Sequence, residues 1–238
     1  MVMIELVNLC KKFGKIDALS QISLSLKNKV ITAVVGPNGS GKTTLIKCIL
    51  GLVSPSMGSI VIDSFNLDGS AEYRKLIGYM PQLPRFPDNL QLGEVILLVK
   101  SLRKSTVSQD EELVSLFGIK DDLHKRVRTL SGGTKQKLNA VIALMFNPGI
   151  LILDEPTAGL DPVASISLKE KIRELSQNGT TVILTSHIIS EIEDLSEEII
   201  FLHEGAVLFQ GTKTDLKGKV QSQNLEEAVA RFMKNGYS

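Results

Sequence analysis

The chain has 238 residues, which suits one large α/β domain or a domain with a subdomain, and its 43% hydrophobic content is enough for a sizeable core. With 27 basic and 26 acidic side chains the net charge is +1, which gives no general electrostatic reason to expect a nucleic-acid partner. The N-terminus lacks the basic and apolar segments of a signal peptide, and no uncharged apolar run approaches the roughly 18 residues of a membrane helix. We therefore expect a soluble, cytoplasmic protein that acts at a membrane only through a partner.

Two strands are expected at the start of the chain, at residues 2–9 and 22–26, with a turn at residues 11–15 that exposes one aromatic side chain, Phe13. Strict alternation of apolar and polar residues in the second strand predicts that one of its faces is exposed. The apolar run at residues 30–35 predicts a buried third strand.

Residues 36–44, GPNGSGKTT, follow that strand and match the phosphate-binding pattern G-x-x-x-x-G-K-[ST]. Glycines without Cβ atoms let the backbone curl, so that the loop N–H groups and the start of the next helix point at one anion. In such a loop Lys42 reaches the β- and γ-phosphates and the Thr43 hydroxyl ligates Mg²⁺. The candidate nucleotide-binding residues here are Gly36, Pro37, Asn38, Gly39, Ser40, Gly41, Lys42, Thr43 and Thr44. A glycine-rich turn that binds nothing is disfavoured, because a strand and a helix flank the loop.

A turn at residues 54–58 is expected next, then a strand at 59–63, a short helix at 70–75 and a strand at 77–80. That last strand leads into Gln82. Its amide can contact Mg²⁺ or the attacking water, or be one more loop amide, and the residues alone leave both open.

Residues 84–147 contain no convincing strand and predict a helical subdomain inserted into an α/β frame. Its last helix begins at a second glycine-rich segment, Ser131, Gly132 and Gly133. A helix start of this kind can bind a phosphate, which suggests a site shared between two chains, or it can be a flexible N-cap.

The buried strand at residues 150–153 ends in Asp154 and Glu155. An acid at the end of such a strand, beside a phosphate-loop strand, is typical of a second Mg²⁺ contact, and its neighbour can polarise water for in-line attack. Two acids that only cap a loop are the alternative. The phosphate loop favours the catalytic interpretation.

Asp161 and Pro162 predict the N-cap and first residue of another helix. A further buried strand at residues 181–185 ends shortly before His187. This histidine can donate a hydrogen bond to a phosphate oxygen, or it can be a structural residue.

Residues 198–202 and 206–209 predict a hairpin, and an amphipathic helix is expected at residues 222–234.

The chain has one phosphate loop and is therefore expected to bind one nucleotide. We expect a single nucleotide-binding domain over residues 1–238, with the helical subdomain at about 84–147.

The motifs together resemble the nucleotide-binding domain of ABC ATPases, over about residues 4–218. The order that carries the resemblance is Phe13, GPNGSGKTT, Gln82, LSGG, LILDEP, Gly159-Leu160-Asp161 and His187. LSGG shortly before LILDEP is specific to this family, whereas a phosphate loop alone is not. The resemblance implies an α/β P-loop NTPase of the ABC type, with a RecA-like core, an antiparallel β-subdomain and an inserted α-helical subdomain.

For the nucleotide held by the chain itself, the resemblance implies ATP with Mg²⁺. Phe13 would stack on adenine, since it replaces the more frequent tyrosine but keeps the aromatic face that stacking needs. Glu155 would be the catalytic base and His187 would hold the γ-phosphate, and Lys42 and Gln82 would be the other catalytic residues. Mg²⁺ would be held by Thr43, Gln82 and Asp154.

For a second subunit, the resemblance implies that the loop Ser131, Gly132 and Gly133 contacts the γ-phosphate of the nucleotide bound by the partner. Asp161 would bridge the two subunits, and Gln82 would couple the nucleotide site to a membrane partner.

Two segments, residues 83–90 (LPRFPDNL) and residues 130–148, look similar to the ATPase of the transporter that serves copper-site maturation in nitrous oxide reductase, the NosF type. This narrower resemblance implies a cargo that is a sulfur species or a copper-linked factor. Its partners would handle that cargo, because the chain shows no copper ligands.

The resemblance thus implies an ATP-hydrolysing subunit that forms a head-to-tail homodimer and drives an integral membrane permease at the inner face of the cell membrane, with no nucleic-acid partner. The alternative is a soluble ABC ATPase without a transport role, such as a scaffold in iron–sulfur cluster assembly.

Overall fold

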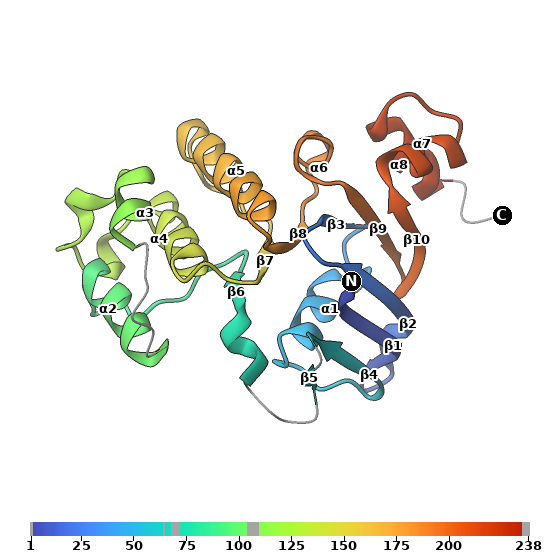
Figure 1. Cartoon of the computed structure of the whole chain (residues 1–238), viewed down its shortest axis with the longest axis horizontal. Coiled ribbons are helices and arrows are strands. Elements are labelled where there is room, and N and C mark those ends of the chain that lie inside the picture. The colour runs from blue at the N-terminus through green and yellow to red at the C-terminus, as the bar shows by residue number, and fades with distance from the viewer. Residues whose placement is uncertain (1, 64, 68–71, 104–109, 235–238) are drawn as a thin grey trace. The chain divides into compact units, whose positions relative to one another are not determined.

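The computed structural model describes residues 2–63, 65–67, 72–103 and 110–234 (Figure 1). The chain divides into two compact units. Unit 1 contains residues 1–74 and 183–238, and unit 2 contains residues 75–182.

Unit 1 carries a four-stranded antiparallel sheet with the order β2-β1-β4-β5. Its strands are β1 (Val2–Phe13), β2 (Ile16–Lys27), β4 (Met57–Ile62) and β5 (Phe65–Asn66). Buried and exposed residues alternate through the second half of β2, as its sequence pattern predicted, because one face of the sheet packs on the core. The two-residue strand β5 was not predicted.

The predicted turn at residues 11–15 has the wrong bounds. Strand β1 continues to Phe13, which pairs with Ile16 at the start of β2. Only Gly14 and Lys15 lie between the strands, and Gly14 has a φ of 59°, the positive value that two-residue hairpins favour. Phe13 therefore ends a strand, with 49% of its surface exposed.

The second sheet of unit 1 has the order β10-β9-β3-β8. Its strands are β3 (Ile31–Val35), β8 (Thr181–Thr185), β9 (Glu198–His203) and β10 (Ala206–Thr212). Strand β3 runs parallel to β9 and is wholly buried, as its apolar run predicted. The boundary between the units falls inside β8.

The helices of unit 1 are α1 (Lys42–Ile49), α6 (Ile189–Leu195), α7 (Lys213–Lys219) and α8 (Leu225–Lys234). Helix α8 docks through Phe232, whose ring lies edge-on at 5.0 Å from Phe201 and 6.0 Å from Phe209. The predicted C-terminal helix thus exists, but it begins at Leu225 because Asn224 caps it by accepting the N–H of Glu226 at 2.7 Å.

Unit 2 contains the parallel pair β6 (Ile77–Met80) and β7 (Ile150–Asp154), together with the start of β8. Its helices are α2 (Leu92–Arg103), α3 (Asp110–Leu116), α4 (Gly132–Leu144) and α5 (Pro162–Gln177). Short 3-10 turns are η2 (Lys120–Asp122) and η3 (Val127–Thr129), and η1 (Glu72–Leu76) spans the unit boundary. None of the helices in the described residues is long and apolar enough to span a bilayer.

Within the predicted helical subdomain, residues 119–125 are helical only over the single turn η2. The carbonyls of Leu123 and Lys125 accept the N–H groups of Gly93 and Leu92, at 2.9 and 3.0 Å. These hydrogen bonds satisfy two N–H groups in the first turn of α2. They require the chain after η2 to adopt a non-helical conformation. Tertiary hydrogen bonding therefore overrides the local helical pattern.

Candidate nucleotide-binding site

The phosphate loop joins β3 to α1 in unit 1, as the motif predicted. Strand β3 ends at Val35 and helix α1 begins at Lys42, with Gly41 as its N-cap at a φ of 103°. No acidic residue lies in the first turn of α1, so its N–H groups and the helix dipole offer uncompensated partial positive charge.

One side of this loop is packed tightly and the other side is open. A Cβ atom on Gly36 would lie 2.0 Å from the carbonyl oxygen of Leu202, and one on Gly41 would lie 2.6 Å from that of Ala18. A Cβ on Gly39 would meet no atom within 4 Å. The loop therefore packs against β2 and β9 at Gly36 and Gly41, while the backbone at Gly39 is open. A phosphate chain can approach the loop from this open side.

The polar groups of the loop fit that ligand as well. Lys42 Nζ donates to the carbonyls of Gly36 and Pro37 at 2.7 and 3.0 Å, which places an ammonium beside the loop backbone. The hydroxyl of Ser40 is buried and has no hydrogen-bond partner among the described residues. Thr43 is exposed at the first turn of α1, where its hydroxyl is a hard oxygen ligand suited to Mg²⁺.

Two further predicted residues belong to unit 1. The exposed ring of Phe13 has Lys11 Nζ at 4.9 Å from its centre, so the ring face can take a flat, electron-rich partner beside a cation. His187 is exposed after β8, which neighbours β3 in the sheet. Ser186 holds this corner, since its hydroxyl donates to Glu191 at 2.9 Å and accepts the N–H of Ile188 at 3.0 Å.

Unit 2 brings the predicted base together with the predicted amide. Glu155 follows β7 at a φ of 50°, and its Oε2 accepts a hydrogen bond of 2.8 Å from Gln82 Nε2. Asp154 is buried at the end of β7, close enough to Tyr79 for its charge to matter. Burial, with that charge as a smaller cause, raises the pKa of Tyr79 to about 12.

The second glycine-rich segment starts α4, as predicted. Ser131 is its N-cap and accepts the N–H of Thr134 at 3.1 Å. Ser131 and Gly132 are exposed, whereas a Cβ on Gly133 would lie 3.1 Å from the carbonyl oxygen of Gly159. The segment thus has an outer side that is open and an inner side that touches the loop before α5.

Asp161 caps α5 as predicted, with Oδ1 accepting the N–H of Ala164 at 2.9 Å. Its Oδ2 forms an ion pair of 2.7 Å with Lys137 on α4. The hydrogen bond from Lys137, followed by that from Ala164, lowers the pKa of Asp161 below its ordinary value. Lys137 was not predicted as a site residue, although its place one helical turn after Gly133 puts both on one face of α4.

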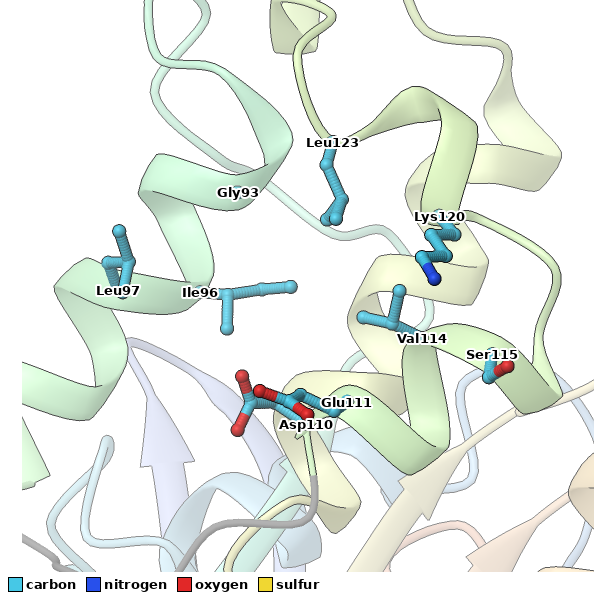
Figure 2. A pocket seen from close by; sticks show the side chains of 9 residues that line it. All are labelled: Gly93, Ile96, Leu97, Asp110, Glu111, Val114, Ser115, Lys120 and Leu123. Carbon is cyan, nitrogen blue, oxygen red and sulfur yellow. The ribbon is translucent and has the colours of Figure 1, made fainter.

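Unit 2 also contains a pocket of about 510 Å³ between α2 and α3 (Figure 2). Ile96, Val114 and Leu123 face its interior, and Asp110 and Glu111 lie at its edge. None of the predicted nucleotide-binding residues lines it, so this is a separate apolar feature of the helical part of the chain.

Comparison with known proteins assigns this chain to a family. The ABC transporter family model matches residues 19–158, more than half of the chain. The lantibiotic transport ATP-binding protein SrtF of Streptococcus pyogenes is 33% identical over 225 residues, covering 94% of this chain and 95% of SrtF.

Solved structures show the same fold. A structure described as the ATP binding subunit of an ABC transporter superposes with a TM-score of 0.91 at 29% identity, covering 98% of this chain and 100% of that one. The dimeric post-hydrolysis structure of the ATP-binding cassette MJ0796, bound to ADP and Pi, gives a TM-score of 0.79 at 27% identity, covering 88% and 98%.

The chain belongs to the ABC transporter family. It is an ATP-binding subunit of such a transporter and hydrolyses ATP to drive transport. The expected α/β ABC-type P-loop fold, with its antiparallel β-subdomain and helical subdomain, is confirmed.

Proposed function

We propose that two copies of the chain bind ATP and Mg²⁺ head to tail, each nucleotide lying between the phosphate loop of one copy and the Ser131 loop of the other. The observation that carries this proposal is that two helices, α1 and α4, begin at glycine-rich segments whose backbone is open. The phosphate loop is open at Gly39, and the α4 segment is open at Ser131 and Gly132. Each chain has one of each, so a dimer has two complete pairs. The dimer of MJ0796 supports this arrangement.

Within one nucleotide site, the loop from Gly36 to Thr44 would bind the phosphates and Phe13 would stack on the base. Thr43, Gln82 and Asp154 would hold Mg²⁺, which neutralises charge on the phosphates. His187 would donate a hydrogen bond to the terminal phosphate.

Glu155 would accept a proton from the attacking water. Its carboxylate is already oriented by the hydrogen bond from Gln82, which fixes one oxygen and limits rotation of the side chain. Gln82 thereby becomes the residue through which a change outside the site can reach the base.

The test is the substitution Glu155→Gln, which keeps the side chain's size but removes the proton acceptor. We expect ATP binding to persist and turnover to fall at least about a hundredfold, the usual contribution of a positioned base. Glu226→Gln, an exposed change on α8, is the matched control and should leave both unchanged. Normal turnover in Glu155→Gln would refute the role of Glu155.

We further propose that the dimer works at the inner face of the cell membrane, against an integral membrane permease. The apolar pocket between α2 and α3 supports this, since Leu97, which lines it, is 64% exposed and offers apolar surface to a partner. A short helix of the permease, with an apolar side chain for the pocket, is the proposed occupant.

Affinity purification from detergent-solubilised membranes of the host tests this partner. Recovery of a multi-span protein with the wild-type chain, and its loss with Leu97→Asp, supports the permease. Recovery of iron–sulfur assembly proteins alone would support the scaffold alternative instead. ATP binding measured on the same Leu97→Asp preparation shows whether the unit remains folded.

Two cargo classes have separate support. The similarity of residues 83–90 and 130–148 to the NosF type supports a sulfur species or copper-linked factor for nitrous oxide reductase maturation. The similarity to the lantibiotic transport ATP-binding protein SrtF supports a lantibiotic as cargo. Deleting the gene in its host separates them: nitrous oxide reductase activity falls in the first case, and resistance to lantibiotics falls in the second.

A further inference from the structure

Helix α4 and the loop that follows Glu155 are joined along one helix face. Gly133 and Lys137 are four residues apart on α4 and so lie on the same side of the helix. Gly133 approaches the carbonyl of Gly159, and Lys137 forms the 2.7 Å ion pair with Asp161. The side chain of Lys137 is 21% exposed and that of Asp161 is 48% exposed, so the lysine is the enclosed partner, unlike Lys12 in the surface pair Lys12–Asp17, which is 61% exposed.

The same helix is also tied to the segment that carries Gln82. Asn139 is buried on α4, and its Nδ2 donates to the carbonyl oxygen of Pro81 at 2.8 Å. Gln82, the next residue, donates to Glu155. These contacts make a closed circuit inside unit 2, from α4 to Asp161, along the loop to Glu155, and back to α4 through Gln82 and Asn139.

We propose that Lys137 is a positioning residue that couples the Ser131 loop to Glu155 through Asp161. This inference rests on the proposed head-to-tail dimer, in which Ser131 contacts the nucleotide of the partner's site. Movement of Ser131 toward that nucleotide carries the start of α4 and, through Lys137, the loop that ends at Asp161. The orientation of Glu155 at one site thereby depends on the nucleotide at the other.

The physical basis is the stiffness of the connection. A lone exposed ion pair adds little to stability, so the effect of Lys137 lies in geometry. Asp161 is held at both carboxylate oxygens, by Lys137 and by the N–H of Ala164, which leaves it little freedom to rotate. Without Lys137 the loop keeps its helix cap and the close approach of Gly159 to Gly133, but it loses the side-chain link between Asp161 and α4.

The test compares Lys137→Met with Lys137→Arg and with Lys125→Met, which removes a different lysine ion pair from unit 2. Turnover is measured against ATP concentration, with nucleotide affinity and thermal unfolding measured on the same preparations. We expect Lys137→Met to lower kcat about tenfold or more, as small misplacements of catalytic groups do. Two linked nucleotide sites should give the wild-type chain a sigmoidal dependence of turnover on ATP concentration. Lys137→Met should lose this sigmoidal dependence, while its nucleotide affinity stays at the wild-type value. Lys137→Arg should restore both properties, and Lys125→Met should change neither.

Asp161→Asn removes the negative charge of the same ion pair. It should keep the N-cap of α5, because asparagine also caps helices well. If Lys137 acts through Asp161, the double variant Lys137→Met/Asp161→Asn should have a kcat no lower than that of the less active single variant. Additive losses, or wild-type kinetics in a folded Lys137→Met protein, overturn this inference. The proposed function fails on different results, namely no turnover in the wild-type chain or normal turnover in Glu155→Gln.

Discussion

Single glycines in the phosphate loop differ in what their replacement should cost. Gly36 has a φ of 149° and a Cβ there would overlap Leu202, whereas Gly39 has a φ of 80° and open space around it. Gly39→Ala should therefore cost about 1 kcal/mol of unfolding free energy from backbone strain alone. Gly36→Ala should cost about 3 kcal/mol, since steric overlap adds to strain. Urea unfolding of both variants measures the difference, and equal losses would contradict the packing described for this loop.

At this scale the sequence predicted side chains whose role follows from local chemistry. Ser131 and Asp161 are N-caps because a short polar side chain before a helical run can accept an orphan N–H. Lys137 and Asn139 could not be found in this way. Their roles depend on which face of α4 meets the loop at Gly159, and that is decided by tertiary packing.

Among the elements, α7 offers a test of capping. The hydroxyl of Thr212 accepts the N–H of Asp215 at 3.1 Å, and Asp215 accepts the N–H and hydroxyl of Thr212 at 2.9 and 2.7 Å. Thr212→Ala should lower the unfolding free energy by about 1 kcal/mol at neutral pH. Thr212→Ser keeps the hydroxyl and should remain close to wild type.

The same cap predicts a pH dependence. The hydrogen bond from the Thr212 hydroxyl is the largest cause that lowers the pKa of Asp215. A lowered carboxyl pKa adds stability above the ordinary value, about 4, and that stability is lost as pH falls through the lowered pKa. The difference between wild type and Thr212→Ala should therefore shrink on acidification. A difference that is constant from pH 7 to pH 3 would contradict this linkage.

Elements with a continuous apolar run or a strong helical period could be predicted, and the short helices α6 and α7 could not. The strand before the phosphate loop is apolar except for Thr32, the strand before Asp154 is a continuous apolar run, and both are wholly buried. Helices α6 and α7 have seven residues each, too few for a helical period to stand out. Helix α7 is stabilised by its capping box, whereas α6 has no side-chain cap, and both helices bury apolar side chains within unit 1.

For the whole molecule, the proposed dimer makes each nucleotide site depend on two chains, which mixing experiments can separate. Lys42→Ala disables the phosphate loop and leaves the Ser131 loop intact. Gly132→Glu disables the Ser131 loop and leaves the phosphate loop intact. The folded chain tolerates the new side chain, because a Cβ on Gly132 meets no atom within 4 Å. Its added negative charge would repel a phosphate brought by the partner.

Each variant alone should hydrolyse little ATP, since every site in its homodimer contains the defect. In the mixture, a heterodimer has one site with the phosphate loop of the Gly132→Glu chain and the Ser131 loop of the Lys42→Ala chain, both intact. Turnover should therefore reappear on mixing and rise with the fraction of heterodimer, measured by ATPase assay across mixing ratios. Thermal unfolding shows whether each variant is folded. If both are folded and no mixture has a turnover above the sum of the two separate variants, the nucleotide is not shared between two chains. Activity in the Gly132→Glu chain alone would show that one chain completes its own site.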